Sequence, residues 1–353
     1  MKLSLFDYNL PRELIAQTPK EPRDVSGLLV YDRKSGKIEH DRFFNLPRYL
    51  QPNDVLVFNN TKVFPARLIM QKPTGGKIEI FLLREIKNGL WQCLIGGRIK
   101  STKKLEIRNQ KSGQALCGQI IGKVAESVWL IKFNLTGKKF LKFIEKHGET
   151  PLPPYIKTKD NKKIRAEYQT IYAKHFGSVA APTAGFHFTK KLLANLKKKD
   201  IAEEFVTLHV GLGTFQPVKV DQIEKHRMHA EFASIDKKTC DFLNAAKKQG
   251  RRIIAVGTTT ARTLEAATDK NGKLRPIKKE VNIFIYPGYK FKFVDGLVSN
   301  FHLPKSTLLM LISAFLGQGK NKNFGIKTMR KIYVTAVRKK YRFYSFGDAM
   351  LIE

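Results

Sequence analysis

The chain has 353 residues, of which 42% are hydrophobic and 27% charged, so it can bury a core and is long enough for two domains. Its net charge of +35 favours a polyanionic partner, a nucleic acid or an anionic membrane, although a general enrichment in lysine would produce the same charge. Three widely spaced cysteines exclude a disulfide framework and a CxxC zinc site. The N-terminus lacks a signal peptide and the most apolar helix, 308–316, is too short for a membrane span, so we expect a cytoplasmic protein.

The first 60 residues predict an α/β region. Residues 54–58 are typical of a short buried strand, and residues 11–15 of the first turn of a helix. From residue 61 to residue 154 the pattern changes to short β-rich runs: Ile78–Leu83, Leu90–Ile95, Lys104–Ile107, Ala115–Ile121 and Ser127–Phe133. Several strands at this spacing predict a small β-barrel.

From about residue 155 the chain alternates strand and helix again. Strands are predicted at Glu204–Val210 and Arg252–Val256, and helices at Thr260–Thr268 and Ser306–Phe315, of which the last is apolar on nearly every face and should be buried. The sequence therefore predicts an α/β fold. Residues 1–60 and 155–353 form a large α/β catalytic domain, which is interrupted by an inserted small β-barrel domain of residues 61–154.

The run Gly177–Thr189 (GSVAAPTAGFHFT) is a candidate ligand site. Its small residues, Gly185 and Thr183 among them, let a ligand approach the backbone closely. Thr189 is a predicted helix N-cap, and His187 precedes it, where backbone N–H groups favour negative charge. A tight turn packed by small residues, with a structural His187, is the alternative interpretation.

A second candidate follows the strand that ends near residue 210. Period-two alternation places His209 at the carboxyl end of this strand, where open α/β sheets bind ligands. Gly211 and Gly213 then permit a loop around a ligand. A single histidine at a strand end is, however, more often structural than catalytic.

The run His226–Glu231 (HRMHAE) pairs imidazoles with a carboxylate. On a helix, His226 and His229 would share one face. Further metal ligands are missing from the pattern, so we favour acid–base chemistry, in which Glu231 orients His229, over a zinc site.

Three consecutive threonines, Thr258, Thr259 and Thr260, follow the strand at 252–256 and Gly257. Hydroxyl groups at a helix N-terminus bind polar ligands, and we include Arg262 with them as a candidate substrate-binding residue. The absence of a Gly-Lys-Ser/Thr sequence excludes a P-loop, and simple N-capping is the alternative.

The last segment combines basic and aromatic residues. Residues 320–342 are rich in Lys and Arg, contain no acid and include two tyrosines, so Lys339, Lys340 and Arg342 are candidate RNA-binding residues. A solvated helix face is the alternative. Residues 341–352 predict a strand with a break at Asp348, which either contacts a ligand or caps a turn.

These runs, taken together, resemble one family, the S-adenosylmethionine:tRNA ribosyltransferase-isomerases of queuosine biosynthesis. The resemblance covers nearly the whole chain, in the order Phe6–Pro19, Asp54–Leu68, Gly148–Ile156, Tyr168–Ala173, Gly177–Thr189, Val206–Val218, His226–Glu231, Ile253–Glu265, Ile283–Lys292, Asn300–Phe315 and Tyr341–Ile352. The chain departs from the family at Asn60 and Lys62, where FNDTRV is usual, and at residues 96–99 (GGRI), so contacts there are not carried over.

The resemblance implies a reaction. The family transfers the ribosyl part of S-adenosylmethionine, isomerised to an epoxycyclopentanediol, onto 7-aminomethyl-7-deazaguanine at the tRNA wobble position. Adenine and methionine are released, and epoxyqueuosine tRNA results. S-adenosylmethionine is a consumed substrate, no cofactor, metal or membrane is expected, and we expect a monomer.

The implied chemistry needs a base beside the sulfonium and a donor for adenine, and histidine suits both near neutral pH. The catalytic candidates are His187, His209 and His229, with Glu231 and Asp348 as carboxylates. Two other classes stay open from the residues alone: a basic RNA-binding protein without catalysis, and an RNA methyltransferase. Glycine, threonine and histidine at strand ends argue against the first, and the missing Gly-rich first βα turn argues against the second.

Overall fold

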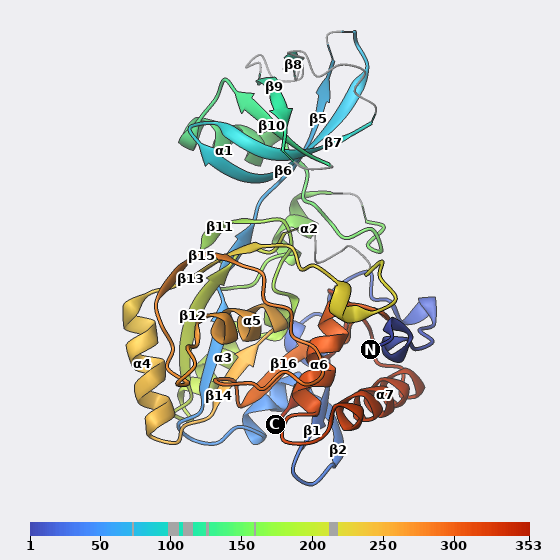
Figure 1. Ribbon diagram of the computed structural model, residues 1–353, viewed down its shortest axis with the longest axis vertical. Helices are drawn as coiled ribbons and strands as arrows, with labels where there is room; N and C mark the ends of the chain where they lie inside the picture. The colour runs from blue at the N-terminus through green and yellow to red at the C-terminus, as the bar shows by residue number, and fades with distance from the viewer. Residues whose placement is uncertain (73, 98–105, 109–115, 125–126, 159, 212–217) are drawn as a thin grey trace.

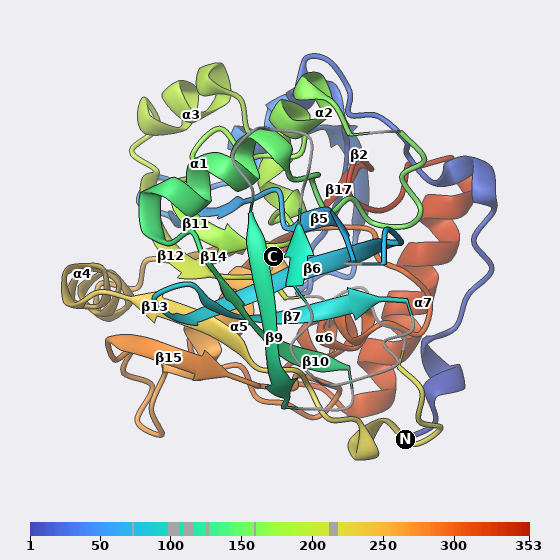
Figure 2. The same ribbon diagram turned by 90° about the horizontal axis from the view of Figure 1, so that it is seen from above.

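The computed structural model describes residues 1–72, 74–97, 106–108, 116–124, 127–158, 160–211 and 218–353. Their strands form one large mixed sheet, a two-stranded parallel sheet and one separate antiparallel sheet, which lies above the large sheet in Figure 1. Figure 2, seen from above, shows the strands of the small sheet lying over the edge of the large one. Among the described residues, none of the helices combines the length and the apolar character that crossing a membrane requires.

The large sheet has a parallel centre. Its order is β15 (Ile277–Val281), β13 (Glu231–Ile235), β12 (Ala202–Leu208), β3 (Val55–Asn59), β14 (Ile253–Val256), β16 (Gly296–Asn300), β17 (Ala349–Ile352), β1 (Gly27–Tyr31) and β2 (Ile38–Arg42). Strands β12, β3, β14 and β16 run parallel, and β17 pairs antiparallel with β16 and parallel with β1. The carboxyl ends of the four central strands therefore meet at one edge.

Helices cover both faces of this sheet. On one face lie α4 (Lys237–Lys248), α5 (Thr258–Ala267), α6 (Thr307–Leu316) and α7 (Lys322–Arg338), and on the other lie α3 (Lys190–Lys197) and the 3-10 helices η4 (Phe43–Arg48) and η6 (Thr183–His187). Val55 and Val57 of β3 pack into the first core, whereas Leu56 and Phe58 pack into the second. Burial of both faces explains why β3 and β14 read as continuous apolar runs.

The small sheet follows β4 (Thr61–Val63), which pairs with β11 (His175–Ser178). It contains β5 (Arg67–Gln71), β6 (Lys77–Lys87), β7 (Leu90–Gly96), β8 (Glu106–Arg108), β9 (Cys117–Lys123) and β10 (Val128–Phe133). Strand β9 pairs with both β8 and β10, so the strands close into a ring with a core of its own that includes Trp91 and Phe133. Helix α1 (Gly137–His147) packs on this core through Phe140.

The remaining short elements lie at the ends of the chain and beside the links between the sheets. They are η1 (Leu3–Phe6), η2 (Arg12–Leu14), η3 (Arg23–Val25), α2 (Lys162–Glu167) and η8 (Ile223–Lys225). Both termini lie in the lower half of Figure 1, away from the small sheet.

The prediction of an α/β fold with a separate β-rich unit is confirmed as a large mixed sheet and a separate antiparallel sheet. Within the described residues, eight strands were not predicted, namely β1, β2, β4, β5, β11, β13, β15 and β16. The predicted strand 104–107 and the start of 115–121 lie partly outside the described residues. The assignment of residues 61–154 as one inserted domain stays a prediction.

The predicted strand at 341–352 is wrong for its first part, because only β17 is a strand. The carboxylate of Asp348 accepts hydrogen bonds from the backbone N–H of Arg342 and of Gly27, both at 2.8 Å. These bonds fold residues 342–348 into a turn, which diverts the backbone from the sheet.

Helix α5 begins at Thr258, earlier than predicted. The backbone turns at Gly257, whose φ of 93° favours glycine, and the helix follows at once. The three threonines therefore lie in the first turn of the helix, whereas the sequence had placed two of them in a loop.

Candidate active site

The edge of the large sheet that faces the small sheet brings together polar side chains from three segments of the chain. His209 follows β12, Thr258 follows β14, and His302 follows β16. Because these strands run parallel, their carboxyl ends bring the three segments together, as open α/β sheets do at their ligand sites.

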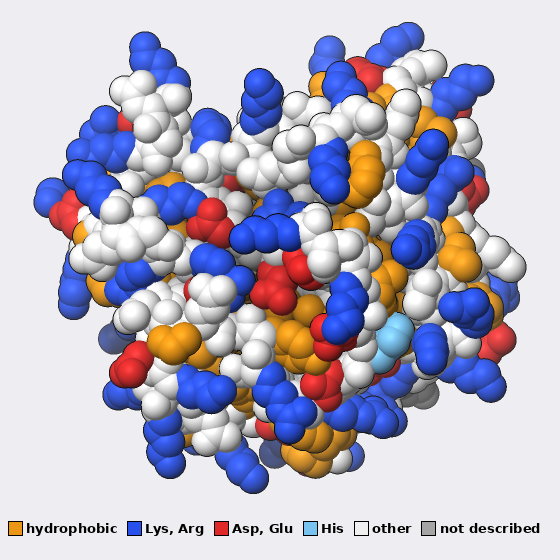
Figure 3. Space-filling model, turned by 90° about the horizontal axis from the view of Figure 1, so that it is seen from below, with side chains coloured by type: hydrophobic (Ala, Val, Ile, Leu, Met, Phe, Trp, Pro, Cys, Tyr) orange, Lys and Arg blue, Asp and Glu red, His pale blue; other side chains and the backbone are white. Residues whose placement is uncertain are grey.

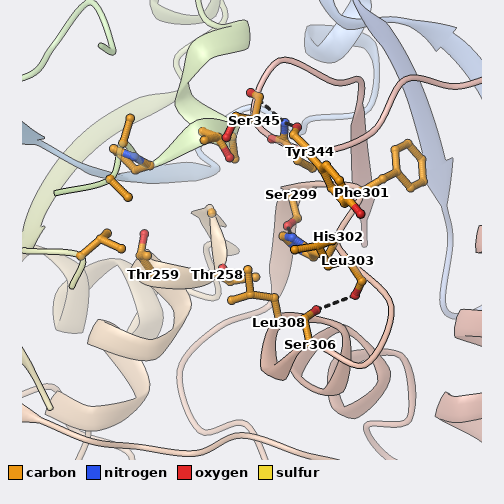
Figure 4. Close-up of a pocket in the computed structure, with 18 of the residues that line it drawn as sticks. Thr258, Thr259, Ser299, Phe301, His302, Leu303, Ser306, Leu308, Tyr344 and Ser345 are labelled. Carbon is orange, nitrogen blue, oxygen red and sulfur yellow. Dashed lines mark hydrogen bonds between the residues drawn. The ribbon is translucent and has the colours of Figure 1, made fainter. Parts of the chain in front are cut away.

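A first cavity lies directly at these strand ends, and we call it the threonine pocket. It is lined by hydroxyl-bearing side chains of α5, β16 and the turn before β17, among them Thr258, Thr259, Ser299 and Ser345 (Figure 4). Its volume is about 90 Å³, below the roughly 300–1,000 Å³ of pockets that hold whole small molecules. A larger ligand must therefore extend beyond it.

A second cavity, which we call the intersheet cleft, supplies that space. It measures about 620 Å³ and lies between the small sheet, which contributes Trp91 and Arg84, and the large sheet, which contributes His209 and Glu231. Val210 lines both cavities, so the threonine pocket adjoins the cleft.

A buried ion pair stands between the two cavities. Arg262 lines the threonine pocket and Glu231 lines the cleft, and their Nη1 and Oε2 atoms are 2.5 Å apart. Both side chains are at most 5% exposed. Among the described residues, Nε and Nη2 of Arg262 are buried without a hydrogen-bond partner. Because buried N–H groups without an acceptor raise the free energy of the fold, we expect the guanidinium of Arg262 to donate hydrogen bonds to an acceptor on a ligand.

Comparison with known proteins identifies the family of the chain. A family model described as "Queuosine biosynthesis protein" matches residues 3–352. The chain belongs to this family.

Relatives named S-adenosylmethionine:tRNA ribosyltransferase-isomerase extend the match. Those from Thermoanaerobacter sp. (strain X514) and Clostridioides difficile (strain 630) are 48% and 47% identical, each over the full length of both chains. A crystal structure of S-adenosylmethionine tRNA ribosyltransferase from Thermotoga maritima is 37% identical, with a TM-score of 0.56, and the match covers 99% of this chain and 100% of that one. The prediction of a transferase in queuosine biosynthesis is thereby confirmed.

In this member of the family, His209 is held at the wall of the cleft. Its Nδ1 lies 2.8 Å from Oγ1 of Thr61, and its ring stacks on Phe232 with centroids 5.6 Å apart. A Cβ at Gly177, where φ is 146°, would lie 2.8 Å from ring atoms of His209, so only glycine fits there. Burial lowers the pKa of His209 to about 4, which keeps the imidazole neutral near pH 7.

His229, Glu231 and Gly211 join His209 in the cleft. His229 is exposed, and residues 226–230 are not helical, so His226 and His229 do not share a helix face as the sequence allowed. The backbone N–H of Gly211 donates to Oε1 of Glu231 at 3.1 Å. Gly213, the other predicted glycine, lies outside the described residues.

The threonine pocket brings together Thr183, Thr258, Thr259 and Arg262 of the predicted substrate-binding set. Thr260 points elsewhere, because its hydroxyl donates to the carbonyl of Val256 at 2.7 Å and the side chain is fully buried. Gly185 serves packing, since a Cβ there would overlap the hydroxyl of Tyr172.

His187 lies behind the pocket wall rather than in it. It is 3% exposed, and its Nδ1 lies 2.7 Å from Oγ of Ser26. Burial lowers the pKa of His187 to about 4 against the opposing effects of Asp348 and Asn300, and of these residues only Asn300 lines the threonine pocket. Asp348 itself caps the turn described above. Neither His187 nor Asp348 lines the threonine pocket or the cleft.

The predicted RNA-binding residues Lys339, Lys340 and Arg342 do not line the cleft. Lys339 and Lys340 are exposed after the end of α7, in the lower part of Figure 1, whereas the small sheet lies at the top. The guanidinium of Arg342 donates to the carbonyl of Thr18.

Sequence reasoning missed several pocket residues, namely Tyr155, Ser299, Asn300, His302, Tyr344 and Ser345. One signal could have found His302, because it stands two residues after a strand in the run NFHLPKS. The strand Gly296–Asn300 contains glycine and polar residues, so its sequence does not show the apolar pattern of a central strand.

Proposed function

We propose that the chain transfers the ribosyl moiety of S-adenosylmethionine, isomerised to an epoxycyclopentanediol, onto 7-aminomethyl-7-deazaguanine at the tRNA wobble position. The products are epoxyqueuosine tRNA, adenine and methionine. Support comes from the family membership and from the pair of adjoining cavities, one small and one open between the two sheets.

The observation that carries this proposal is the Arg262–Glu231 pair. S-adenosylmethionine bears a carboxylate, an ammonium and a sulfonium close together. The N–H groups of Nε and Nη2 of Arg262, which lack a partner among the described residues, suit the carboxylate, and Glu231 beside them suits the positive groups. We therefore expect the methionine part to bind at the junction of the two cavities.

The intersheet cleft suits the nucleotide that receives the ribosyl group. A base in an anticodon loop can be splayed out and stacked on aromatic side chains, and Trp91 and Phe176 line the cleft. His209 and His229 are then the candidate bases for the 5′-carbon of the ribosyl group and for the attacking amine. A neutral imidazole at His209 accepts a proton without first losing one.

The finer assignments belong to the same proposal. Residues 61–154 form an inserted barrel domain, a proposal supported by the ring of strands β5–β10 and its separate core. The enzyme is expected in the cytoplasm, as a monomer, and without a cofactor or metal.

One assay tests the reaction. The chain is incubated with S-adenosylmethionine, labelled separately in the adenine, the methionine and the methyl group, and with tRNA carrying the deazaguanine base. Release of both adenine and methionine in step with ribosyl incorporation is the expected result. Labelled methyl on the RNA would indicate a methyltransferase, and binding without release would indicate a passive RNA-binding protein.

A further inference from the structure

The threonine pocket differs from the cleft in its charges. Among the described residues that line it, none is a carboxylate, and the one cation, Arg262, stands at the side of the cleft. The other lining side chains carry hydroxyl or amide groups, or are small and apolar, or aromatic. The ring centroids of Tyr155 and Tyr344 lie 4.6 Å apart. Such walls suit a flat, neutral, polar group, which in S-adenosylmethionine is adenine.

His302 is the imidazole of this pocket. Its backbone is fixed from two sides, because its N–H donates to the hydroxyl of Tyr333 on α7 at 3.1 Å and its carbonyl accepts from the hydroxyl of Tyr8. Its Nε2 lies 2.8 Å from Oγ of Ser299, beside the space that the threonines border (Figure 4).

Ser299 determines which ring nitrogen of His302 carries the proton. The Ser299 hydroxyl is 1% exposed and sits on β16, so it must donate its proton inside the protein. Among the described residues, Nε2 of His302 is the acceptor that the structure offers this hydroxyl. Nε2 therefore accepts, and Nδ1 carries the proton. Burial lowers the pKa of His302 to about 3, so the ring is neutral at pH 7 and has one N–H to offer.

We propose that Nδ1–H of His302 donates a hydrogen bond to a ring nitrogen of adenine and stabilises the charge that develops there as adenine leaves. This inference rests on the proposed function, which it deepens by naming a catalytic residue and the part of the substrate that it contacts. When the C1′–N9 bond breaks, its electron pair stays on adenine. His302 keeps its proton throughout, and adenine is neutralised by one of the protons that the 5′-carbon and the attacking amine release. A fixed, neutral donor of this kind acts on developing negative charge without reorganising.

Two variants at position 302 test the donor. With saturating tRNA and S-adenosylmethionine, His302→Ala is expected to slow single-turnover adenine release by about 100-fold or more. His302→Asn places an amide N–H near the position of Nδ1 and should recover part of that loss. His147→Ala, at the end of α1, is the matched control, because that ring packs on Phe143 and lies away from both cavities. Thermal unfolding of each variant checks that the fold survives.

Analogues of S-adenosylmethionine with CH in place of adenine N1, N3 or N7 separate a donor from a packing role. For the analogue that removes the true acceptor, the wild-type enzyme should lose about as much as His302→Ala loses with the natural substrate. His302→Ala should then lose little more, so the two losses are not additive. This cycle, which combines the enzyme variant with each substrate analogue, is measured twice. Calorimetry gives the binding affinities, and single-turnover kinetics gives the rates of adenine release.

The outcomes are distinct. Additive losses for all three analogues, or His302→Ala variants that release adenine at the wild-type rate, would overturn the inference about His302. If the wild-type chain binds S-adenosylmethionine but releases no adenine from it, the proposed function fails. In that case the binding cycle still decides whether His302 contacts adenine.

Discussion

The threonine pocket and the intersheet cleft adjoin each other, but they are built differently. The pocket is enclosed by β16, α5 and the turn before β17, and its imidazole, His302, is hydrogen-bonded to the hydroxyl of Ser299. The cleft is wider and lies between the two sheets, where the small sheet contributes Arg84 and Glu85 and the large-sheet side contributes His209, His229, Glu231 and Glu280. The difference indicates a division of labour, in which the pocket holds the small-molecule leaving group and the cleft admits a nucleotide of a large RNA.

The largest effect is expected at the Arg262–Glu231 pair, which joins the two regions. Arg262→Met leaves the Glu231 carboxylate buried without its cation, so the free energy of unfolding should fall by about 3–5 kcal/mol. S-adenosylmethionine affinity should fall by about 100-fold or more, because a charge-assisted contact to its carboxylate is lost. Denaturant titration and calorimetry measure these effects.

The double variant Arg262→Met, Glu231→Gln is the control. Removing both charges should restore most of the stability but not the affinity. If the double variant binds S-adenosylmethionine as wild type does, the pair supports the fold and does not contact the substrate.

His209→Ala should impair the reaction in the cleft without impairing ligand binding in the threonine pocket. We expect the single-turnover rate to fall by about 100-fold while S-adenosylmethionine binding changes little, because the ring faces the cleft. His229→Ala is measured beside it, and His226→Ala, whose ring packs on Phe284, is the matched control. His187→Ala should lower stability more than rate. The assignment of an imidazole base is wrong if His187, His209 and His229 can each be replaced at near-normal rates.

Acid should destabilise the protein through its buried imidazoles. Burial holds the pKa of His187 and His209 at about 4 and that of His302 at about 3, all below the ordinary value of 6.5. The unfolded chain therefore binds more protons between these values, so stability is fully present above pH 6.5 and is lost as the pH falls toward 4. Each ring should contribute up to about 2 kcal/mol of loss between pH 6.5 and pH 5. Denaturant unfolding at both pH values, with His302→Asn for comparison, measures this slope, and an unchanged slope in the variant would contradict it.

The sequence predicted those parts of the fold and site that depend on local patterns. β3 and β14 are short apolar runs with buried faces on both sides, and His209 and Thr258 stand at the ends of predicted strands. It could not predict that Glu231 pairs with Arg262, because that contact depends on how α5 packs against β13. His302 was not predicted as a site residue for a similar reason. Only the pairing of β16 beside β14 brings it to the pocket.

The smallest effect should come from single basic residues, and it tests whether tRNA extends beyond the cleft. Figure 3 shows Lys and Arg side chains spread over the whole lower face, so charge alone does not mark the RNA surface. If Lys339 and Lys340 contact phosphates, the double change to Gln should weaken tRNA binding several-fold and reduce the slope of log affinity against log salt by about 2.

Two comparisons decide between surfaces. Lys238→Gln with Lys248→Gln on α4 removes the same charge from another exposed place. Arg84→Gln removes a cation from the cleft wall, where Arg84 pairs with Glu280 of the large sheet. If only the cleft variant changes the salt slope, the α7 end is a solvated helix face and tRNA recognition is confined to the cleft. If the α7-end, α4 and Arg84 variants instead all lose the same small part of the tRNA affinity, the basic residues make no fixed contact. They then act through a diffuse positive field that speeds the encounter with tRNA.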